Sequence, residues 1–449
     1  MEGGASRPAR GTELKLEIGS LAYGGAGVAR LNGYVVFVAG GLPGDRVRAV
    51  VEKSKRAYAQ ARAVEVLKPG SDRVPPRAEH PGAPWQELAY ERQVQVKQDQ
   101  VDDALRRIGR LEGFTLEPIV PAVEQWRYRN KLEYSFGTGP DGDLVCGFHA
   151  PGRWDQIVSI DDCLLASVAA NEVRERVVDW CRAQQLAPYD RRTGEGLLRN
   201  LVVREGRRTS QLQVRLLTAP VDIDRSGLRD AVGSEASVLW TETEQQGETT
   251  QGGETELLGG SDRLGEEISG MRFEISPEAF FQTNTEMAER LYALTIEYAQ
   301  LGGFERVYDL YCGIGAIASL IAPRAAEVWG LELSEQAVAD AIRNADLNEI
   351  DNAHFFAGDV RLAVRDLVER AGRPDVVVVD PPRAGLSQKV VRRIIEAAPR
   401  RIVYVSCNPT TLAPNAAQLV EAGYELLRVR PVDMFPQTPH IECVALLER

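Results

Sequence analysis

Two short motifs near the carboxyl end of the chain hold side chains suited to covalent catalysis. Cys407 lies in the tetrapeptide Ser-Cys-Asn-Pro directly after an apolar run, and Glu442 lies in His-Ile-Glu-Cys-Val. A cysteine taken alone is more often a small buried hydrophobic residue. A polar flank at the end of a buried strand favours a reactive thiol, because parallel sheets present ligand-binding groups there. Glu442 would ordinarily be a surface carboxylate, and His440 a structural hydrogen-bonding residue.

A glycine-rich turn upstream indicates a nucleotide-like cofactor. Residues 309–316 run Asp-Leu-Tyr-Cys-Gly-Ile-Gly-Ala, and Glu332 follows Gly313 by nineteen positions. Such a turn lets the backbone approach a ligand closely, and an acid at this distance can accept hydrogen bonds from ribose hydroxyls. A dinucleotide site would carry a third glycine, whereas Asp309 could hold an amino-acid ammonium and Asp359 could lie near an adenine. The pattern favours S-adenosylmethionine over a dinucleotide.

A thiol, a carboxylate and a sulfonium donor together can methylate C5 of a uracil ring. C5 is a poor nucleophile until a thiolate adds to C6 and generates an enolate. A base must then remove the C5 proton so that the thiolate can leave. Cys407 and Glu442 supply the thiol and the base, and the glycine-rich turn supplies the donor site. The surroundings of the cysteine have to favour its thiolate.

The elements expected to hold these groups alternate between strands and helices. After a helix capped by Asn284 or Thr285, the runs at 376–379 and 401–405 are apolar without alternation. Strands of this kind are buried on both faces of a parallel sheet. The C-terminal part is therefore predicted to be a doubly wound α/β domain. Its strands are expected at residues 306–310, 327–331, 354–356, 376–379 and 401–405.

Residues 12–68 contain closely spaced strands separated by glycine turns, which is typical of a small OB-type β-barrel. Near its end lie Lys53, Lys55, Arg56 and Tyr58. A charge run of this kind is more often a solvated face than a binding site. The functional alternative is a surface that follows phosphates and stacks on bases.

The centre of the chain is predicted to form a mixed α+β domain. Residues 86–112 favour a helix, and residues 247–254, rich in Gly, Thr, Gln and Glu, favour an exposed and mobile loop. The expected domain organisation is a barrel at 12–68, a middle domain at 75–275 and a catalytic domain at 276–449.

Length and composition fit a soluble globular chain of about three domains. The 449 residues are 44% hydrophobic and 26% charged, which excludes a disordered, collagen-like or disulfide-stapled protein. The net charge of −12 argues against a nucleic-acid partner when the chain is taken whole. Thirteen acids against four arginines at 221–275 account for most of it. The barrel, with nine Lys or Arg against five acids, and residues 191–220, with seven Arg against two acids, are where RNA phosphates are expected.

The six cysteines contain no Cys-x-x-Cys pair, and their scatter favours reduced thiols in the cytoplasm. No apolar run reaches the roughly 18 residues of a membrane span, and no apolar segment follows the arginines of the first ten residues. We expect a cytoplasmic monomer without a membrane partner.

Five segments together resemble the RNA uracil-5-methyltransferase family, which includes the 23S rRNA and tRNA 5-methyluridine enzymes. They are Phe-Phe-Gln-Thr-Asn at 280–284, the turn at 309–315, Asp-Pro-Pro-Arg-Ala-Gly-Leu at 380–386, and the motifs at 406–409 and 440–444. The resemblance spans nearly the whole chain with weaker similarity elsewhere. It implies a Rossmann-like class I methyltransferase domain at the C-terminus and a TRAM domain, an RNA-binding module, at the N-terminus.

The resemblance also implies roles for individual residues. Cys407 becomes the nucleophile and Glu442 the base, and Asp380 is also expected to hold the uracil. The expected cofactor contacts are Gln282, Tyr311, Gly313, Glu332, Asp359 and Asp380. The expected RNA contacts are Lys53, Lys55 and Arg56 of the barrel, and Arg127, Arg129 and Lys131 at the start of the middle domain, for which a basic strand edge is the plain alternative.

The chain departs from the family pattern in two places. Many relatives carry an iron–sulfur cluster on three cysteines after the barrel and a fourth further on. Residues 77–88 contain no cysteine here, and Cys163 alone occupies the fourth position. A cluster needs about four ligands, so we expect no iron–sulfur cluster, no other metal and a merely packed Cys163. Ala316 replaces a polar residue of several relatives and may remove one cofactor hydrogen bond.

The leading hypothesis is S-adenosylmethionine-dependent formation of 5-methyluridine in 23S rRNA, with tRNA uridine-54 as the alternative target. The barrel motivates the rRNA preference, because minimal tRNA enzymes of the family often lack it. A second hypothesis is an RNA-binding factor with a vestigial catalytic domain, which the intact Cys407, Glu442 and Asp380 disfavour. A nicotinamide-dependent oxidoreductase is disfavoured by the incomplete glycine pattern.

Overall fold

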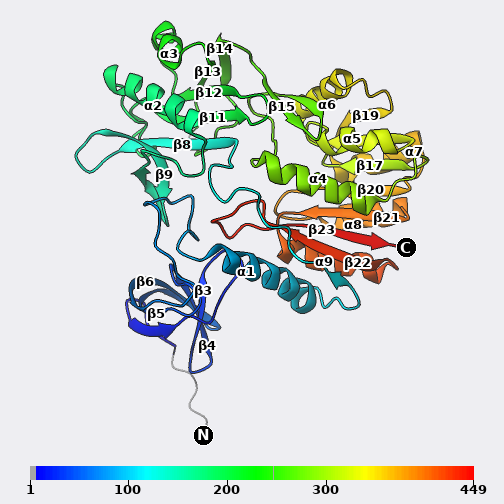
Figure 1. The fold of residues 1–449 in the computed structure, drawn as a ribbon, viewed down its shortest axis with the longest axis horizontal. Helices are drawn as coiled ribbons and strands as arrows, with labels where there is room; N and C mark the ends of the chain where they lie inside the picture. The colour runs from blue at the N-terminus through cyan, green and yellow to red at the C-terminus, as the bar shows by residue number, and fades with distance from the viewer. Residues whose placement is uncertain (1–6, 246) are drawn as a thin grey trace.

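A computed structural model describes residues 7–245 and 247–449. Figure 1 shows three parts: a small N-terminal barrel, a middle sheet with helices, and a larger C-terminal sheet covered by helices. Among the described residues, no helix combines the length and the apolar character needed to cross a bilayer.

The barrel is a six-stranded sheet with its apolar side chains turned inward. Val36, Val38, Val47 and Ala49 are fully buried in its core. The turn at 32–33 has positive φ at both residues, as an Asn-Gly hairpin turn requires. The strands are β1 (Glu13–Glu17), β2 (Ser20–Leu21), β3 (Gly27–Leu31), β4 (Tyr34–Ala39), β5 (Arg46–Ser54) and β6 (Tyr58–Lys68), in the order β1-β5-β6-β4-β3-β2.

The segment after the barrel packs on the C-terminal part of the molecule. Helix α1 (Tyr90–Asp103) runs into a π-helical turn, η1 (Ala104–Ile108), within the helix expected at 86–112. Leu105 and Phe114 join the core beneath the C-terminal sheet, and β7 (Thr115–Leu116) adds a strand to that sheet beside β22. Residues 101–116, which the sequence assigns to the middle domain, are thus built into the catalytic part.

The middle part is a seven-stranded sheet covered by two helices. Apolar residues of α2 and of the central strands, among them Val173, Val177, Leu201 and Val214, form one buried core. Its strands are β8 (Lys131–Thr138), β9 (Leu144–Ala150), β10 (Arg153–Ser159), β11 (Leu198–Gly206), β12 (Gln211–Thr218), β13 (Ala236–Glu242) and β14 (Glu254–Gly259), in the order β10-β9-β8-β11-β12-β13-β14, with helices α2 (Val168–Ala183) and α3 (Arg225–Val232) and the separate hairpin β15 (Leu264–Ile268) and β16 (Met271–Ile275).

The C-terminal part confirms the doubly wound prediction. Its strands run in the order β19-β18-β17-β20-β21-β23-β22-β7, and the apolar strands β20 and β21 are buried on both faces. The elements are α4 (Thr285–Ala299), β17 (Arg306–Leu310), α5 (Ala316–Ile321), η2 (Ala322–Arg324), β18 (Glu327–Glu332), α6 (Glu335–Leu347), β19 (Ala353–Ala357), α7 (Val360–Ala371), β20 (Val376–Val379), α8 (Gln388–Ala397), β21 (Arg401–Ser406), α9 (Pro409–Glu421), β22 (Glu425–Val432) and β23 (Glu442–Glu448).

Strand order determines where a ligand can bind in this sheet. Successive strands are added on one side of β17 up to β19 and on the other side from β20 onward, so the strand order reverses between the parallel neighbours β17 and β20. Ligands of open α/β sheets bind at the carboxyl ends of the strands at such a switch point. The glycine-rich turn after β17 and the motif at 380–383 after β20 both lie at this edge.

Candidate active site

Cys407 and Glu442 are brought together by the last strand of the sheet. Strand β23 inserts antiparallel between β21 and β22, and its register sets Ser406 opposite Cys443. Cys407 follows Ser406 and Glu442 precedes Cys443, so both residues lie next to the last pair of this ladder, where the charge of Glu442 acts on Cys407. Cys407 is partly exposed, whereas Glu442 is 4% exposed. A thiol and a carboxylate therefore share one site at the carboxyl end of β21.

The acidic surroundings keep the resting thiol protonated. Burial, with the charges of Glu442 and Asp380, raises the pKa of Cys407 to about 12, and Arg383 opposes the shift. Burial and Asp380 also raise the pKa of Glu442 well above its usual range, while burial raises the pKa of Asp380 to about 7. Perturbed acids that converge on one thiol are typical of a functional site. A positive charge brought to this cluster would favour both the thiolate and the carboxylate.

The segment that carries His440 and Glu442 is held from several sides. Lys97 of α1 forms a fully buried ion pair with Asp433 at 2.5 Å and donates to the Phe435 carbonyl at 3.0 Å. The Tyr90 hydroxyl donates to the other Asp433 oxygen at 2.9 Å. A buried pair of this kind is costly to break because one charge would remain without a partner. Helix α1 therefore supports the segment at 433–441, which leads from β22 to Glu442, a role that the sequence patterns did not indicate.

His440 faces Arg383 rather than the thiol. Its Nδ1 lies 3.4 Å from the Arg383 guanidinium, and burial together with this cation lowers the pKa of His440 to about 4. The Arg383 carbonyl accepts hydrogen bonds from the side chains of Asn408 and Thr411, which joins the motif at 380–383 to the motif at 406–409. The neutral His440 imidazole is thus a structural partner of this junction.

The glycine-rich turn adopts the conformation that a close ligand approach requires. Gly313 and Gly315 have φ of 53° and 78°, and Tyr311 has φ of 69°. A Cβ on Gly315 would come within 3.0 Å of Ala341 and Phe355, so the turn packs tightly on its sheet. The Glu332 carboxylate accepts the Gly313 amide at 3.2 Å, which ties the ends of β17 and β18 together.

Asp309 is a buried carboxylate that forms no ion pair with any cation in the described part of the chain. It is fully buried in β17, and among the described residues neither carboxylate oxygen has a hydrogen-bond partner of normal geometry. Burial and the charge of Asp380 raise the pKa of Asp309 to about 8, and the nearby Ala318 amide offsets only part of this. An orphaned buried acid fits a cationic ligand, because the ligand would supply the missing partner. The sulfonium and ammonium groups of S-adenosylmethionine meet this requirement.

The other expected cofactor residues have different surroundings. Tyr311 is half-buried at the turn and lies within the electrostatic reach of Asp359. Asp359 caps α7 and forms a two-oxygen ion pair with Arg361, which holds the pKa of Asp359 below its usual range. Gln282 is 5% exposed, and its carbonyl accepts the Asn130 amide at 3.0 Å. Ala316 begins α5.

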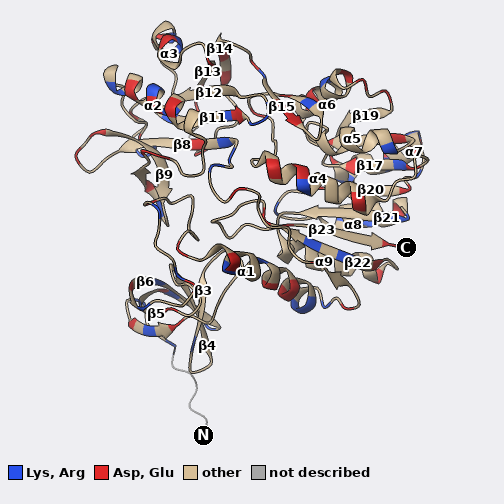
Figure 2. Cartoon of the chain, in the orientation of Figure 1, with Lys and Arg blue, Asp and Glu red and all other residues tan. Residues whose placement is uncertain are grey.

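The expected RNA-binding cations of the barrel and of the middle domain differ in exposure. Lys53, Lys55 and Arg56 are exposed at the end of β5 and the following turn. Arg127 instead pairs with Asp162 at 2.6 Å and donates to two backbone carbonyls. The Arg127 guanidinium is thus bonded within the protein, and its contact with RNA stays a prediction. Figure 2 shows basic and acidic residues interspersed over all three parts.

The Lys131 side chain also forms an ion pair within the protein, whereas the Arg129 side chain contacts an aromatic ring. The Lys131 ammonium pairs with Glu133 at 2.6 Å, and burial lowers the pKa of Lys131. Arg129 lies over the Phe435 ring at 5.8 Å, beside the loop that leads to Glu442. Of the three expected RNA contacts at 127–131, Arg129 is therefore the one that lies against the loop leading to Glu442.

The arginines of residues 191–220 do not form the positive surface that the local charge predicts. Arg204 and Arg215 are buried, with bonds to the Ala279 and Thr250 carbonyls at 2.6 Å each. Arg199 is buried and donates to the Gly247 carbonyl at 2.9 Å. Arg207 and Arg208 pair with acids of neighbouring segments, including Glu286 and Glu289. Arg192 and Arg208 remain exposed, and phosphate binding by this segment stays a prediction.

The loop at 247–254 explains part of this arrangement. Glu248 pairs with Arg191 and with His149 and accepts hydrogen bonds from Ser135 at 2.7 Å and Asn200 at 3.1 Å. The segment lies between β13 and β14 as predicted, yet it is fastened to the sheet rather than fully exposed.

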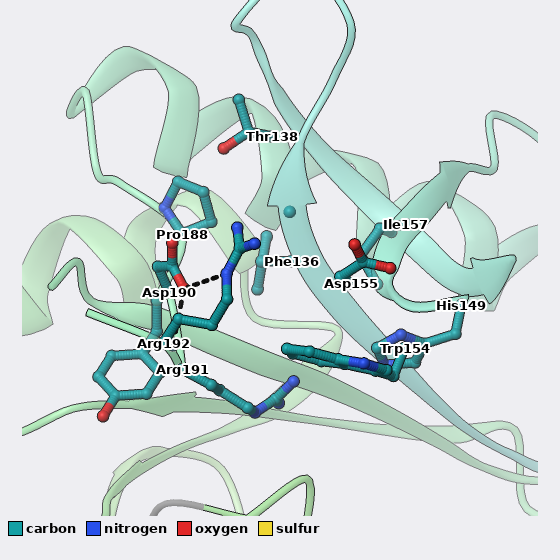
Figure 3. A pocket seen from close by; sticks show the side chains of 12 residues that line it. Phe136, Thr138, His149, Trp154, Asp155, Ile157, Pro188, Asp190, Arg191 and Arg192 are labelled. Carbon is teal, nitrogen blue, oxygen red and sulfur yellow. Dashed lines mark hydrogen bonds and ion pairs between the residues drawn. The ribbon is translucent and has the colours of Figure 1, made fainter. Parts of the chain in front are cut away.

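Arg191 and Arg192 border a cavity of about 270 Å³ at the β10 edge of the middle sheet. Figure 3 shows Arg192 joined to Asp190, with Trp154 and Arg191 on the opposite side. Trp154 is 61% exposed. Because Asp190 and Glu248 neutralise the two arginines, this cavity is not a strongly positive phosphate site.

Cys163 lies in a buried polar cluster. Its Sγ is 3.3 Å from His80 Nε2, and Arg127 donates to its carbonyl at 3.2 Å. Within residues 7–245 and 247–449, no three His, Cys, Asp or Glu side chains gather in a way that could hold a metal ion.

Sequence analysis also missed Tyr23 in the barrel. Its hydroxyl donates to the carbonyl of Cys407 at 3.3 Å across 384 positions of the chain. No local pattern indicates such a contact, since Tyr23 lies in an ordinary glycine turn.

Comparisons with known proteins agree with this geometry. Residues 262–449 match the tRNA (uracil-5-)-methyltransferase family, and residues 8–64 match the TRAM domain. An uncharacterized RNA methyltransferase of Bacteroides thetaiotaomicron is 37% identical, over 95% of this chain and 100% of that protein. One of Halalkalibacterium halodurans is 36% identical, over 97% of this chain and 96% of its own.

A solved structure is similar along nearly the whole chain. The tRNA (uracil-54, C5)-methyltransferase of Pyrococcus abyssi, in complex with S-adenosyl-L-homocysteine, has a TM-score of 0.78 and 28% identity. The match covers 97% of this chain and 100% of that one. The chain therefore belongs to the RNA uracil-5-methyltransferase family, whose members use S-adenosylmethionine, and carries a TRAM domain at its N-terminus.

Proposed function

We propose that this enzyme methylates C5 of a specific uridine in a folded RNA through a covalent bond between Cys407 and C6. The observation that carries the proposal is the proximity of Cys407 and Glu442, which lie next to the Ser406–Cys443 pair at the ligand-binding edge of the sheet. A thiol that is to add to C6 and a base that is to act at the neighbouring C5 have to reach adjacent atoms of one ring. A uridine that meets both groups has to leave its base stack.

In this proposal the chain's own residues perform three tasks. The Cys407 sulfur forms a bond to C6, and the electron pair of the C5–C6 double bond moves toward the C4 oxygen. Bound S-adenosylmethionine would supply a positive charge and an electrophilic methyl group. The electrons of the enolate form the bond from C5 to this methyl group, and those of the broken sulfur–methyl bond leave with S-adenosylhomocysteine. Glu442 then takes the C5 proton, and the electrons of that C–H bond restore the double bond as the sulfur leaves C6. Its raised pKa makes Glu442, once ionised, a stronger base than an exposed carboxylate.

We further propose that the cofactor lies between the turn at 311–315 and the orphaned Asp309. Glu332 is oriented for the ribose by its bond to Gly313. Tyr311, Gln282, Asp359 and Asp380 line the same ligand in this proposal, with Asp380 also available to the uracil. The barrel at 12–68 docks the RNA, residues 75–275 extend the docking surface, and residues 276–449 carry the chemistry in the cytoplasm.

For the RNA class, we propose 23S rRNA as the first target and tRNA as the second. The barrel alone no longer favours rRNA, because the tRNA enzyme of P. abyssi matches 97% of this chain, which leaves too few residues unmatched to omit the barrel. That similarity is the observation that favours tRNA.

The test is transfer of labelled methyl groups to total RNA of a strain that lacks the enzyme, followed by mapping of the modified uridine. We expect label in 23S rRNA from the wild-type enzyme and none from Cys407→Ala. Glu442→Gln should stall after bond formation and accumulate the RNA–protein adduct. Label confined to tRNA would overturn the rRNA target. Unmeasurable S-adenosylmethionine binding by calorimetry would instead favour an RNA-binding factor.

A further inference from the structure

The turn at residues 22–26, between β2 and β3 of the barrel, lies against Cys407 and against the segment that leads to Glu442. The Tyr23 hydroxyl donates to the Cys407 carbonyl at 3.3 Å. Tyr23 also lies within the electrostatic reach of Arg383 and Glu442, two further residues of the site. A module expected only to dock RNA thus contacts the backbone of the nucleophile.

The position of this turn is set by close packing. Gly24 and Gly25 have φ of 88° and 93°, and the Gly25 amide donates to the Ala22 carbonyl at 2.9 Å. A Cβ on Gly25 would lie 3.1 Å from Trp85 Nε1 and 3.2 Å from Pro439 Cβ. Glycine is favoured here for both reasons, since the backbone is left-handed and a Cβ would crowd Trp85 and Pro439. Pro439 lies three positions before Glu442, so the turn abuts the segment that carries the base.

Two further contacts hold the barrel against the catalytic part. A buried apolar cluster joins Leu21 and Leu42 of the barrel to Trp85, Leu88 and Val96. Gln100 of α1 donates its side-chain amide to the Leu21 carbonyl at 3.1 Å. Burying apolar side chains across this junction favours one relative position of the two parts. This packing therefore holds the barrel, and Tyr23 with it, in a fixed position relative to Cys407.

The Tyr23 hydroxyl stays protonated and can therefore donate a hydrogen bond. Burial and the charge of Cys407 raise the pKa of Tyr23 to about 12, although Arg383 opposes the shift. The hydroxyl keeps its proton at neutral pH and can donate to the carbonyl throughout the reaction. Tyr23 remains 38% exposed, so its contact lies at the mouth of the site rather than in the core.

We propose that Tyr23 is a positioning residue, through which the RNA-binding barrel sets the orientation of Cys407 for attack on C6. The inference rests on the proposed covalent mechanism. Cys407 follows the last residue of β21, so beyond Ser406 the sheet no longer holds its backbone. The hydrogen bond from Tyr23 supplies a restraint at this point. Displacement of the sulfur by a fraction of an ångström would slow its addition more than it would weaken binding.

The test compares Tyr23→Phe and Tyr23→Ala with the wild type under single-turnover conditions at saturating RNA and S-adenosylmethionine. A second readout is the rate of adduct formation with RNA that carries 5-fluorouridine at the target. Tyr23→Phe keeps the ring and removes one donor, so we expect both rates to fall about tenfold, the loss expected for one hydrogen bond. Tyr23→Ala should fall further. RNA and cofactor affinities and the thermal midpoint of Tyr23→Phe should stay unchanged.

Tyr34→Phe is the matched control, because the Tyr34 hydroxyl donates to the Lys55 carbonyl at 2.6 Å within the same barrel, away from the catalytic loop. Its rate at saturation should equal that of the wild type. A Tyr23→Phe enzyme with a normal saturated rate, or one that only binds RNA more weakly, would overturn the positioning role. A wild-type enzyme that forms no adduct at all would instead overturn the proposed covalent mechanism along with it.

Discussion

The barrel and residues 191–220 carry similar positive charge in the sequence and use it differently in the fold. Lys53, Lys55 and Arg56 of the barrel are exposed at a turn. Arg204 and Arg215 of the middle part are buried and donate to backbone carbonyls. Charge counted along the chain predicts a phosphate-binding surface in both places, but Arg199, Arg204 and Arg215 are buried, whereas the barrel cations at 53–56 face solvent.

The difference lies in the acceptors that the fold brings to each cation. The carbonyls that receive Arg204 lie 72 to 75 positions away, in the segment that leads to α4. A buried guanidinium needs such acceptors, because leaving its donors unpaired is costly. A local charge count contains no information about groups so distant in sequence. The following predictions separate cations that hold the fold from cations available to RNA.

The largest expected effect is that of Arg204→Ala. The variant leaves three backbone carbonyls without their donor, so we expect a loss of about 3 kcal/mol in the free energy of unfolding. Urea denaturation followed by circular dichroism measures it. RNA affinity per folded molecule should not change. A variant of normal stability that binds RNA weakly would show that Arg204 faces the RNA.

Asp309 presents the opposite case, a buried charge whose partner has to come from outside the chain. Its raised pKa of about 8 means that the folded protein holds a proton that the unfolded chain releases near pH 4. Stability of the free enzyme should therefore fall as pH rises from about 4 to 8. Affinity for the cationic cofactor should rise over the upper part of this range, by up to about tenfold per pH unit.

Calorimetric titration with S-adenosylmethionine between pH 6 and pH 8 checks the Asp309 prediction. Asp309→Asn should bind weakly and lose the pH dependence. An Asn variant that retains both the affinity and its pH dependence would mean that another group accepts the cation.

The third largest effect is expected when the exposed cations of the barrel are neutralised. Replacement of Lys53, Lys55 and Arg56 by alanine should lower RNA affinity about tenfold and reduce the salt slope of the binding constant by about 2. The thermal midpoint should stay constant because these side chains are exposed. Fluorescence anisotropy over a salt series measures both quantities, with Arg365→Ala/Arg370→Ala on the surface of α7 as the control. Equal salt slopes for the triple variant and the wild type would exclude this turn from the RNA interface.

Arg127→Ala should lower the stability of the fold and leave RNA binding unchanged. Its ion pair with Asp162 raises the pKa of Arg127 and is partly exposed, so we expect a loss of about 1 kcal/mol in stability. RNA affinity should be unchanged in the same anisotropy assay. Weaker RNA binding at full stability would restore Arg127 as an RNA contact.

The smallest effect is expected from Glu248→Gln. Burial works against its ionisation, but hydrogen bonds from Ser135 and Asn200 and the charge of Arg191 hold the pKa of Glu248 below its usual range. The amide keeps an acceptor and removes the charge that neutralises Arg191. RNA affinity should rise about twofold at low salt. A fall in affinity would indicate that the loop itself binds RNA.

Sequence patterns predicted the C-terminal sheet closely because its central strands are rich in apolar residues, and β20 consists of four valines. The expected strands at 306–310 and 376–379 coincide with β17 and β20. The adjacency of Cys407 and Glu442 could be inferred only through family resemblance. It arises because β23 passes between β21 and β22, and nothing in the residues of β23 specifies that order.

The polar contacts between residues far apart in the chain could not be predicted from the sequence. The contacts of Tyr23 with Cys407 and of Lys97 with Asp433 join residues more than 300 positions apart. Each depends on how the barrel and α1 dock on the catalytic part. Such docking is a property of whole surfaces rather than of local spacing.

The central claim, a covalent bond from Cys407 to the target uridine, is tested most directly by adduct trapping. A fluorine at C5 leaves no proton for Glu442 to remove, so the sulfur cannot leave C6 after methyl transfer. Wild-type enzyme with S-adenosylmethionine and RNA containing 5-fluorouridine should yield a band that survives denaturing electrophoresis, and mass spectrometry should locate the nucleotide on Cys407. Cys407→Ser should bind the cofactor normally and give no such band. An adduct on another residue, or normal methylation by Cys407→Ser, would contradict the account.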